Sequence, residues 1–210
     1  MPPDRDWIDR QLRSRGIDDR RVLEAMARVP RDLFLPDELR GLAYADEALP
    51  IGAGQTVSQP FIVAFICQAL ALTGGERVLD VGTGSGYQAA VLAELAAEVH
   101  TIERIPELAH GARAALDAAG YERVRVHVAD GTLGLPEHAP FAGIAVAAAT
   151  PELPAALWDQ LAAGARIVLP LGSRRWQELC TIERSPDGPL LLGRLPVRFV
   201  PLVAGGFTGG

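Results

Sequence analysis

Three glycines follow a short apolar segment near the middle of the chain, in the sequence DVGTGSG. They are Gly82, Gly84 and Gly86, and the segment RVLDVG (77–82) is expected to form a strand. Glycines between a strand and a helix let the backbone approach a ligand, because a side chain would fill that space. A dinucleotide-binding fingerprint would need its third glycine at the position that Tyr87 occupies.

The spacing is instead GxGxG, with Thr83 and Ser85 between the glycines and the acidic Asp80 before them. It is closer to the loop that holds the methionine part of S-adenosylmethionine. That ligand has no pyrophosphate, so the loop need not present a helix N-terminus to phosphate. The alternative is a tight glycine turn that binds no ligand.

Acidic residues end the next two predicted strands. Glu103 ends EVHTIE (98–103), and Asp130 ends RVRVHVAD (123–130) before Gly131. Glu103 could accept hydrogen bonds from both ribose hydroxyls of a nucleoside, and Asp130 could accept one from an adenine amino group. Either acid alone could be a solvated charge. Parallel strands direct their C-terminal ends to one crevice, however, and the sequence therefore favours a nucleoside site there.

Small polar residues also precede the first long apolar helix, in PIGAGQTVSQP, where the chain is expected to form an exposed loop. Two interpretations of Ser58 follow. It could cap the helix whose apolar positions begin at Phe61. Alternatively, the loop could lie over a bound cofactor and hold a substrate against it.

The elements that must position these residues alternate between strand and helix after Gly74–Gly75. Besides the three strands, the pattern predicts helices at 87–96, 106–120 and 152–164, and strands at 143–149 and 165–172. Such alternation is typical of an α/β protein with a doubly wound, mostly parallel sheet and helices on both faces.

The two ends of the chain differ from this pattern. Residues 4–49 are charged and helical, and Val22, Leu23, Met26 and Val29 form one apolar stripe. Near the other end, QELCTIERS and LLLGRLPVRFVPL are joined by the turn SPDG, which predicts an antiparallel strand pair at the sheet edge. We expect one compact domain, with N-terminal helices and a loop over 1–60 and a ligand-binding core over 61–210.

Composition and charge exclude several classes of protein. The 210 residues carry a net charge of −6, and no basic cluster is longer than the pair Arg174–Arg175, which argues against nucleic acid as the main partner. The longest apolar run is broken by Gln68 and is too short to span a bilayer, and the charged start is no signal peptide. Cys67 and Cys180 are expected to be reduced thiols. We expect a cytoplasmic monomer without a membrane partner.

The four histidines, His100, His110, His127 and His138, form no spaced pair, and the two cysteines have no CxxC spacing. The sequence therefore predicts no metal site.

Several segments together resemble the protein-L-isoaspartate O-methyltransferase family, which repairs aged aspartyl and asparaginyl residues. They cover most of the chain: QTVSQP, RVLDVGTGSGYQAA, TIERIPELA, ADGTLGLPEHAPF, AAATPELP, QLAAGARIVLPLG, QEL and VRFVPL. The glycine cluster alone would indicate only a class I methyltransferase with a Rossmann-like fold. QTVSQP and the segments near the C-terminus are more specific.

The resemblance implies that S-adenosyl-L-methionine is the cofactor and that isoaspartyl-containing proteins and peptides are the substrates. It implies that Ser58 is the active-site serine and that the loop residues around it line the cleft. The expected cofactor-binding set is Gln55, Thr56, Val57, Ser58, Asp80, Gly82, Thr83, Gly84, Ser85, Gly86, Glu103, Arg104, Asp130 and Gly131. One position departs from the family pattern, because Ala142 replaces the usual acid after the aromatic residue. We expect a structural role there.

The implied acceptor is the free α-carboxylate of an isoaspartyl residue, and the ordinary carboxylate pKa of about 3.5 to 4 leaves it ionised at neutral pH. No strong general base is then required, and the enzyme must supply position and hydrogen-bond donors. The methyl ester would let the neighbouring backbone nitrogen close a succinimide, whose hydrolysis returns some normal aspartate. Two alternatives remain: a class I methyltransferase acting on a small molecule or RNA, and a non-catalytic module that senses the cofactor.

Overall fold

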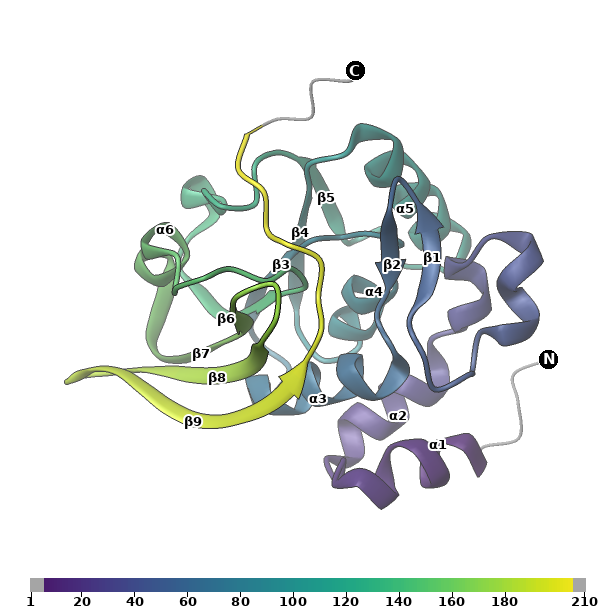
Figure 1. The fold of residues 1–210 in the computed structure, drawn as a ribbon, viewed down its shortest axis with the longest axis horizontal. Coiled ribbons are helices and arrows are strands. Elements are labelled where there is room, and N and C mark those ends of the chain that lie inside the picture. The colour runs from purple at the N-terminus through teal and green to yellow at the C-terminus, as the bar shows by residue number, and fades with distance from the viewer. Residues whose placement is uncertain (1–5, 206–210) are drawn as a thin grey trace.

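The computed structural model describes residues 6–205, which form an α/β fold around one seven-stranded sheet. Its strands are β3 (Arg77–Val81), β4 (Glu98–Glu103), β5 (Arg125–Val128), β6 (Phe141–Val146), β7 (Leu161–Gly172), β8 (Gln177–Ser185) and β9 (Gly188–Val197). They lie in the order β5-β4-β3-β6-β7-β8-β9 (Figure 1). The pairs from β5 to β7 are parallel, and β8 and β9 are antiparallel. The predicted fold class is confirmed, including the C-terminal antiparallel pair.

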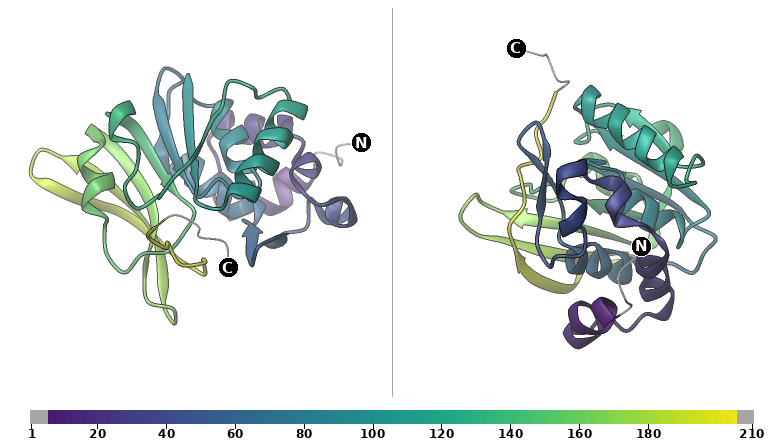
Figure 2. Two further views of the ribbon diagram at one scale, coloured as in Figure 1. Left: turned by 90° about the horizontal axis from the view of Figure 1, so that it is seen from above. Right: turned by 90° about the vertical axis from the view of Figure 1, so that its right-hand side faces the viewer.

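Helices cover both faces of the sheet (Figure 2). The α-helices are α1 (Asp6–Gln11), α2 (Arg20–Arg28), α3 (Pro60–Leu70), α4 (Tyr87–Ala93), α5 (Pro106–Ala118) and α6 (Ala155–Asp159). The short 3-10 helices are η1 (Arg13–Arg15), η2 (Arg31–Phe34), η3 (Asp37–Leu42) and η4 (Pro136–His138). One face of the sheet packs against α3, α4 and α5, and the other against α6.

The central strand β3 shows why these strands appear as apolar runs in the amino-acid sequence. Val78 and Leu79 are both fully buried, yet they belong to two different hydrophobic clusters, one on each face of the sheet. A strand of a parallel sheet that is covered on both faces has no solvent side, so both sets of alternating side chains are apolar. The ends of such strands are then the places left for polar function.

The N-terminal helices attach to the same core. The Asp19 carboxylate caps α2 by accepting hydrogen bonds from the N–H groups of Arg21 and Val22. The Arg21 guanidinium donates to the carbonyls of Leu72 and Leu95, at 2.6 and 3.0 Å, and so links α2 to the segments after α3 and α4. The predicted apolar stripe is buried in full: Val22, Leu23, Met26 and Val29.

Only the middle of the helix predicted over 152–164 is confirmed, because α6 begins at Ala155. Helix α6 ends at Asp159, and β7 already begins at Leu161. Two contacts hold the chain at this point: the Gln160 side chain accepts from Leu135 N–H and donates to the Leu133 carbonyl, both at 2.7 Å. Gly164 then adopts a φ of 74°, which ends any helical continuation.

The segment predicted as an exposed loop before α3 is an antiparallel hairpin. Its strands are β1 (Leu49–Gly52) and β2 (Gln55–Val57), and the two turn residues Ala53 and Gly54 have φ of 49° and 69°. Positive φ at both central residues is the geometry of the tight turn that matches strand twist.

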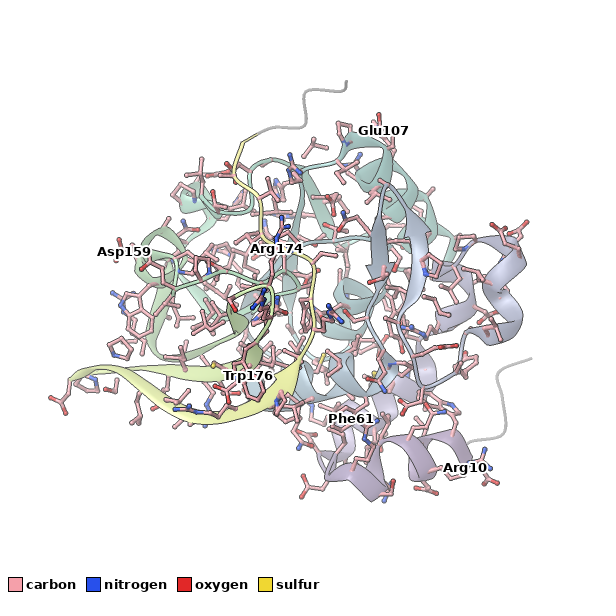
Figure 3. The ribbon with its side chains drawn as sticks, in the orientation of Figure 1. Arg10, Phe61, Glu107, Asp159, Arg174 and Trp176 are labelled. Carbon is pink, nitrogen blue, oxygen red and sulfur yellow. The ribbon has the colours of Figure 1, made fainter. Side chains whose placement is uncertain are left out.

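At the β9 edge of the seven-stranded sheet, β8 and β9 are joined through the predicted SPDG turn. The turn between β7 and β8 carries Arg174 and Trp176, whose side chains are labelled in Figure 3. The chain then crosses the strand ends: Ala149 N–H donates to the Val200 carbonyl, and Leu202 N–H to the Ala149 carbonyl. Cys67 and Cys180 are buried free thiols, as predicted. Within residues 6–205, no helix has the length and apolar character needed to cross a membrane.

Candidate active site

The glycine loop leaves β3 in a conformation that other residues rarely adopt. Gly82, Gly84 and Gly86 have φ of 97°, 53° and 90°. Gly131 has a different reason to be glycine, because a Cβ there would lie 2.7 Å from Val81 Cγ1. The loop after β3 therefore needs glycine for its backbone conformation, and the turn after β5 needs it for its close packing on Val81.

A buried chain of hydrogen bonds fixes this loop from below. The Asp80 carboxylate accepts from Gln88 Nε2 at 2.7 Å and from the Thr101 hydroxyl at 2.8 Å. Because the Thr101 proton goes to Asp80, the Thr83 hydroxyl must donate to Thr101, at 2.6 Å. Burial raises the pKa of Asp80 to about 6, although the hydrogen bonds from Gln88 and Thr101 lower it.

Glu103 connects the ends of two strands. One carboxylate oxygen accepts from Gly84 N–H at 2.9 Å and the other from Ile105 N–H at 3.0 Å. The residue is only 6% exposed, yet it lines a cleft. A carboxylate oxygen has two lone pairs, so each can accept one more hydrogen bond from a ligand.

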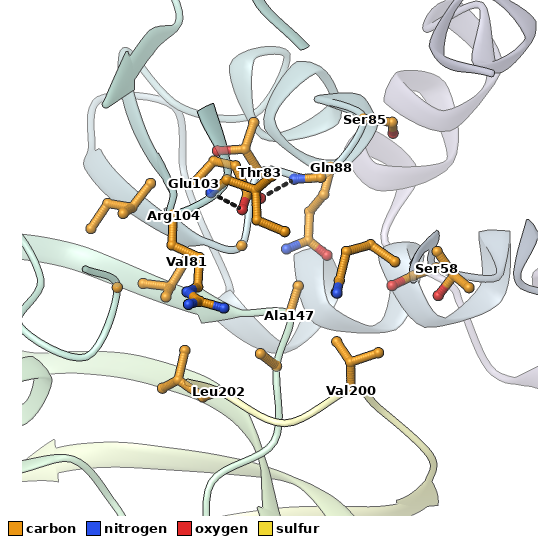
Figure 4. Close-up of a pocket in the computed structure, with 18 of the residues that line it drawn as sticks. Ser58, Val81, Thr83, Ser85, Gln88, Glu103, Arg104, Ala147, Val200 and Leu202 are labelled. Atoms are coloured by element: carbon orange, nitrogen blue, oxygen red, sulfur yellow. Dashed lines mark hydrogen bonds between the residues drawn. The ribbon is translucent and has the colours of Figure 1, made fainter. Parts of the chain in front are cut away.

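This cleft, called the cofactor cleft below, lies at the C-terminal ends of β3, β4 and β6. Figure 4 shows Glu103 and Arg104 on one side of it and Ser58 on the other. Most of the residues predicted from the sequence meet there: Gln55, Thr56, Val57, Ser58, Gly82, Thr83, Gly84, Ser85, Glu103, Arg104 and Gly131.

The other predicted residues lie behind or beside the cleft. Asp80 is fully buried beneath the loop. Gly86 begins α4 and faces α5, where a Cβ would lie 3.2 Å from Leu116 Cγ. The Asp130 carboxylate accepts from Thr132 N–H, the Thr132 hydroxyl and Gly205 N–H. Burial alone would raise the pKa of Asp130, but these hydrogen bonds lower it.

Several cleft residues were not predicted. Gln88 lines the cleft from the first turn of α4, and its Oε1 is buried without a hydrogen-bond partner among residues 6–205. Ala147 and Ala148 follow β6, as the glycine loop follows β3, and this position after a strand is a signal that could have identified them. The segment Val200–Val203 also lines the cleft. It overlaps the family segment VRFVPL, but its apolar residue types do not by themselves mark it as part of a site.

Ser58 lies where the cofactor cleft meets a second hollow, called the side groove below. Ser58 lines both, as do Thr56, Ala147 and Val200, and the groove continues along Phe61, Ile62 and 195–199. The helix-cap interpretation of Ser58 is wrong, because the N-cap of α3 is Gln59 and no side chain caps it. Within residues 6–205, the Ser58 hydroxyl has no hydrogen-bond partner.

The hairpin holds these residues over the glycine loop. A Cβ on Gly84 would lie 3.3 Å from Ile51 Cδ1, so β1 packs directly on the loop. Gln59 Nε2 donates to the Asp46 carbonyl, and Arg15 pairs with the Asp46 carboxylate at 2.8 Å. The Arg15 guanidinium also lies 3.6 Å above the centre of the Phe61 ring.

Ala142 lies in β6 beside an irregularity in its pairing with β7, outside the residues that line the cleft.

Known proteins share both the sequence and the fold. The family described as protein-L-isoaspartate(D-aspartate) O-methyltransferase (PCMT) matches residues 5–206. Protein-L-isoaspartate O-methyltransferase 1 of Syntrophobacter fumaroxidans is 55% identical over 196 residues, which are 93% of this chain and 92% of that protein. Protein-L-isoaspartate O-methyltransferase 2 of Marinobacter nauticus is 58% identical, over 92% of this chain and 89% of that one.

Solved structures agree. A protein-L-isoaspartate O-methyltransferase superimposes with a TM-score of 0.84 at 28% identity, covering 97% of this chain and 66% of that chain. A Plasmodium falciparum protein described as a protein-L-isoaspartate O-methyltransferase, solved with S-adenosyl-L-homocysteine, gives a TM-score of 0.81 at 26% identity, covering 95% and 97%. This chain therefore belongs to the protein-L-isoaspartate(D-aspartate) O-methyltransferase family.

Proposed function

We propose that this S-adenosylmethionine-dependent methyltransferase methylates the free α-carboxylate of L-isoaspartyl residues in damaged proteins and peptides, with Ser58 orienting that carboxylate. The observation that carries the proposal is the position of Ser58, whose side chain lines both the cofactor cleft and the side groove. A group that must meet both a cofactor and a peptide belongs at such a junction.

The residues of the cleft fit the cofactor. Its nucleoside part needs an acceptor for ribose hydroxyls, and Glu103 retains a free lone pair on each oxygen after accepting from Gly84 and Ile105. Gly131 lies so close to Val81 that it has no room for a Cβ, and both residues line the cleft. Gln88 offers a buried, unpaired amide oxygen to a donor group. When bound, S-adenosylmethionine supplies an electrophilic methyl group on its sulfonium.

The side groove suits an extended peptide. Phe61, Ile62 and Phe199 supply apolar walls, and the guanidinium groups of Arg15 and Arg198 lie among its lining residues. Arg15 is already paired with Asp46, so it is the charge of Arg198 that favours a substrate presenting a carboxylate. An isoaspartyl residue presents one on a short arm beside its own peptide chain, so a groove for the chain that meets the cofactor cleft at Ser58 suits such a substrate.

Methyl transfer to a carboxylate requires little acid–base catalysis by the protein. A substrate carboxylate is ionised at neutral pH, because its pKa is about 3.5 to 4. No histidine is among the cleft-lining residues between positions 6 and 205. The Ser58 hydroxyl, free of other partners in that range, can donate to one carboxylate oxygen and leave the other to attack. The hairpin and the C-terminal segment both line the site.

The decisive experiment compares two substrates. Purified protein is incubated with methyl-labelled S-adenosylmethionine and either an isoaspartyl peptide or its normal-aspartyl twin. We expect base-labile methyl ester on the isoaspartyl peptide alone. Equal labelling of both peptides, or labelling of neither while the cofactor still binds, would contradict the proposed substrate.

A further inference from the structure

Three histidines meet away from the cofactor cleft, on the sheet face that carries Phe141. His100, His127 and His138 each place one ring nitrogen within 4.8 Å of the other two. His100 is fully buried, and His127 and His138 are partly exposed. They belong to β4, β5 and η4, and none of them lines the cleft. Nothing in the methyl-transfer reaction uses them.

We propose that these three histidines form a binding site for a divalent transition-metal cation of the zinc class. Neutral imidazole is a preferred ligand of such ions, and three protein nitrogens with water in the fourth position form a common tetrahedral site. The partial exposure of His127 and His138 leaves room for that water. The proposal is independent of the methyl-transfer function, because the site shares no residue with the cleft.

The distances are close to those of a tetrahedral site. With metal–nitrogen bonds of about 2.0 to 2.1 Å, ligand nitrogens are separated by about 3.3 Å. His100 Nδ1 and His127 Nε2 face each other at 3.0 Å and need almost no movement. The widest separation within the trio is at most 4.8 Å, so closing the site requires a shift of about 1.5 Å. His138 ends a short 3-10 helix and is partly exposed, so it can make that shift.

Glu98 already makes the contact that metal-binding histidines usually have. Its Oε1 lies 3.1 Å from His100 Nε2, and the carboxylate is paired with both Arg77 and Arg125. A carboxylate held by two guanidinium groups is ionised and can only accept, so His100 carries its proton on Nε2. The lone pair of His100 Nδ1 then points toward His127. A carboxylate behind a ligand histidine fixes its tautomer and raises its basicity.

Arg77 places the third histidine relative to the first. Its Nε donates to Glu98 Oε2 at 2.6 Å, and its Nη1 donates to the backbone carbonyl of His138 at 3.1 Å. One side chain thus holds both the carboxylate behind His100 and the backbone of His138. Such preorganisation lowers the cost of assembling a metal site. Both nearby cations, Arg77 and Arg125, are paired with Glu98, which limits their repulsion of a bound ion.

The competing explanation is a packed cluster that needs no ion. The His100 and His127 rings are stacked, with centroids 5.2 Å apart and planes 12° apart, and a hydrogen bond joins them. That arrangement alone would satisfy both residues. The two explanations differ in whether added metal binds with defined stoichiometry.

The test uses the full-length protein, prepared without a histidine tag and treated with chelator. Zn²⁺ is titrated by calorimetry, and Co²⁺ is added separately because its visible absorption distinguishes four-coordinate from six-coordinate sites. We expect one ion per chain, a four-coordinate Co²⁺ spectrum and a melting temperature that rises with Zn²⁺. His127→Gln and His138→Gln should each weaken Zn²⁺ binding at least about tenfold, and Glu98→Gln about tenfold to a hundredfold.

His110→Gln is the matched control, because His110 is exposed on α5 and outside the trio. It should bind like the parent. All variants should keep methyl-transfer activity and a cooperative thermal transition, since they leave the cleft intact. The proposal is overturned if the parent binds no Zn²⁺, or if folded His127→Gln and His138→Gln both bind as tightly as the parent. It also fails if His110→Gln removes the binding.

Discussion

The N–H of Gly84 donates a hydrogen bond of 2.9 Å to Glu103 Oε2, which joins the loop after β3 to the end of β4. The other oxygen of Glu103 accepts from Ile105 N–H. The carboxylate is therefore fixed in orientation by backbone alone, and because Glu103 lines the cofactor cleft, each oxygen keeps a lone pair for a ligand. Two features that the sequence shows separately, an acid and a glycine loop, act as one unit.

The first prediction concerns that carboxylate. Glu103→Ala should weaken binding of S-adenosylhomocysteine by about 1.5 to 3 kcal/mol, the range for losing hydrogen bonds to a charged acceptor. Calorimetric titration of the folded variant measures it. Glu107→Ala removes an exposed acid from α5 and should leave affinity unchanged. If Glu103→Ala bound as tightly as the parent, the ribose contact would have to lie elsewhere.

Ser58→Ala should separate chemistry from stability. The hydroxyl has no partner within residues 6–205 and does not cap α3, so the melting temperature and cofactor affinity should stay near those of the parent. Single-turnover methylation of an isoaspartyl peptide should slow by about tenfold to a thousandfold, because one well-placed donor is lost. The exposed Ser14→Ala serves as the control. If Ser58→Ala had a lower melting temperature but methylated the peptide as fast as the parent, Ser58 would not be the residue that orients the carboxylate.

Replacement by alanine should change the free energy of unfolding in opposite directions at Gly131 and Gly111. In Gly131→Ala the new Cβ would lie 2.7 Å from Val81 Cγ1, and the stiff, buried Val81 cannot move aside. We expect a loss of about 1 to 3 kcal/mol in the free energy of unfolding, together with weaker cofactor binding.

Gly111→Ala is the matched substitution, because Gly111 is exposed on α5 and a Cβ there meets nothing within 4 Å. It should raise the free energy of unfolding by about 0.5 to 1 kcal/mol, since alanine favours a helix interior. Denaturant unfolding without cofactor measures both variants. Equal effects of the two changes would argue against the steric explanation.

Asp80 should make stability depend on pH. Burial raises its pKa from 3.8 to about 6 in the folded protein, so the folded state holds this proton more tightly than the unfolded chain. The tighter proton binding of Asp80 therefore adds to the free energy of unfolding below about pH 4, and this contribution is lost as the pH rises through about 6. Asp80→Asn stays neutral and can keep both hydrogen bonds, because the Thr101 and Thr83 hydroxyls can reverse their direction. The free energy of unfolding of Asp80→Asn should exceed that of the parent by about 1 to 3 kcal/mol at pH 7.5 and equal it near pH 4.

The measurement is denaturant unfolding of the cofactor-free protein at both pH values. Asp117→Asn, an exposed acid on α5, is the control and should show no such difference. A gap between Asp80→Asn and the parent that is the same at pH 4 and pH 7.5 would contradict the explanation by burial of charge.

The strand ends that form the cleft could be predicted without coordinates. The strands before Gly82 and Glu103 are buried on both faces, so they appear as short apolar runs, and the polar or glycine residues that end them stand out. The rule that parallel strands direct their C-terminal ends to one crevice then brought those residues together. The antiparallel pair followed from its turn residues.

Other features depend on contacts between distant parts of the chain. Ser58 could have been a helix cap or a cleft residue, and the choice depended on how the hairpin packs over Gly84. The three histidines and the segment Val200–Val203 became neighbours of distant elements only through strand order and register. Local sequence patterns carry the period of a helix or strand. They do not carry the contacts between residues far apart in the chain, because those depend on which strands pair and how the chain returns to them.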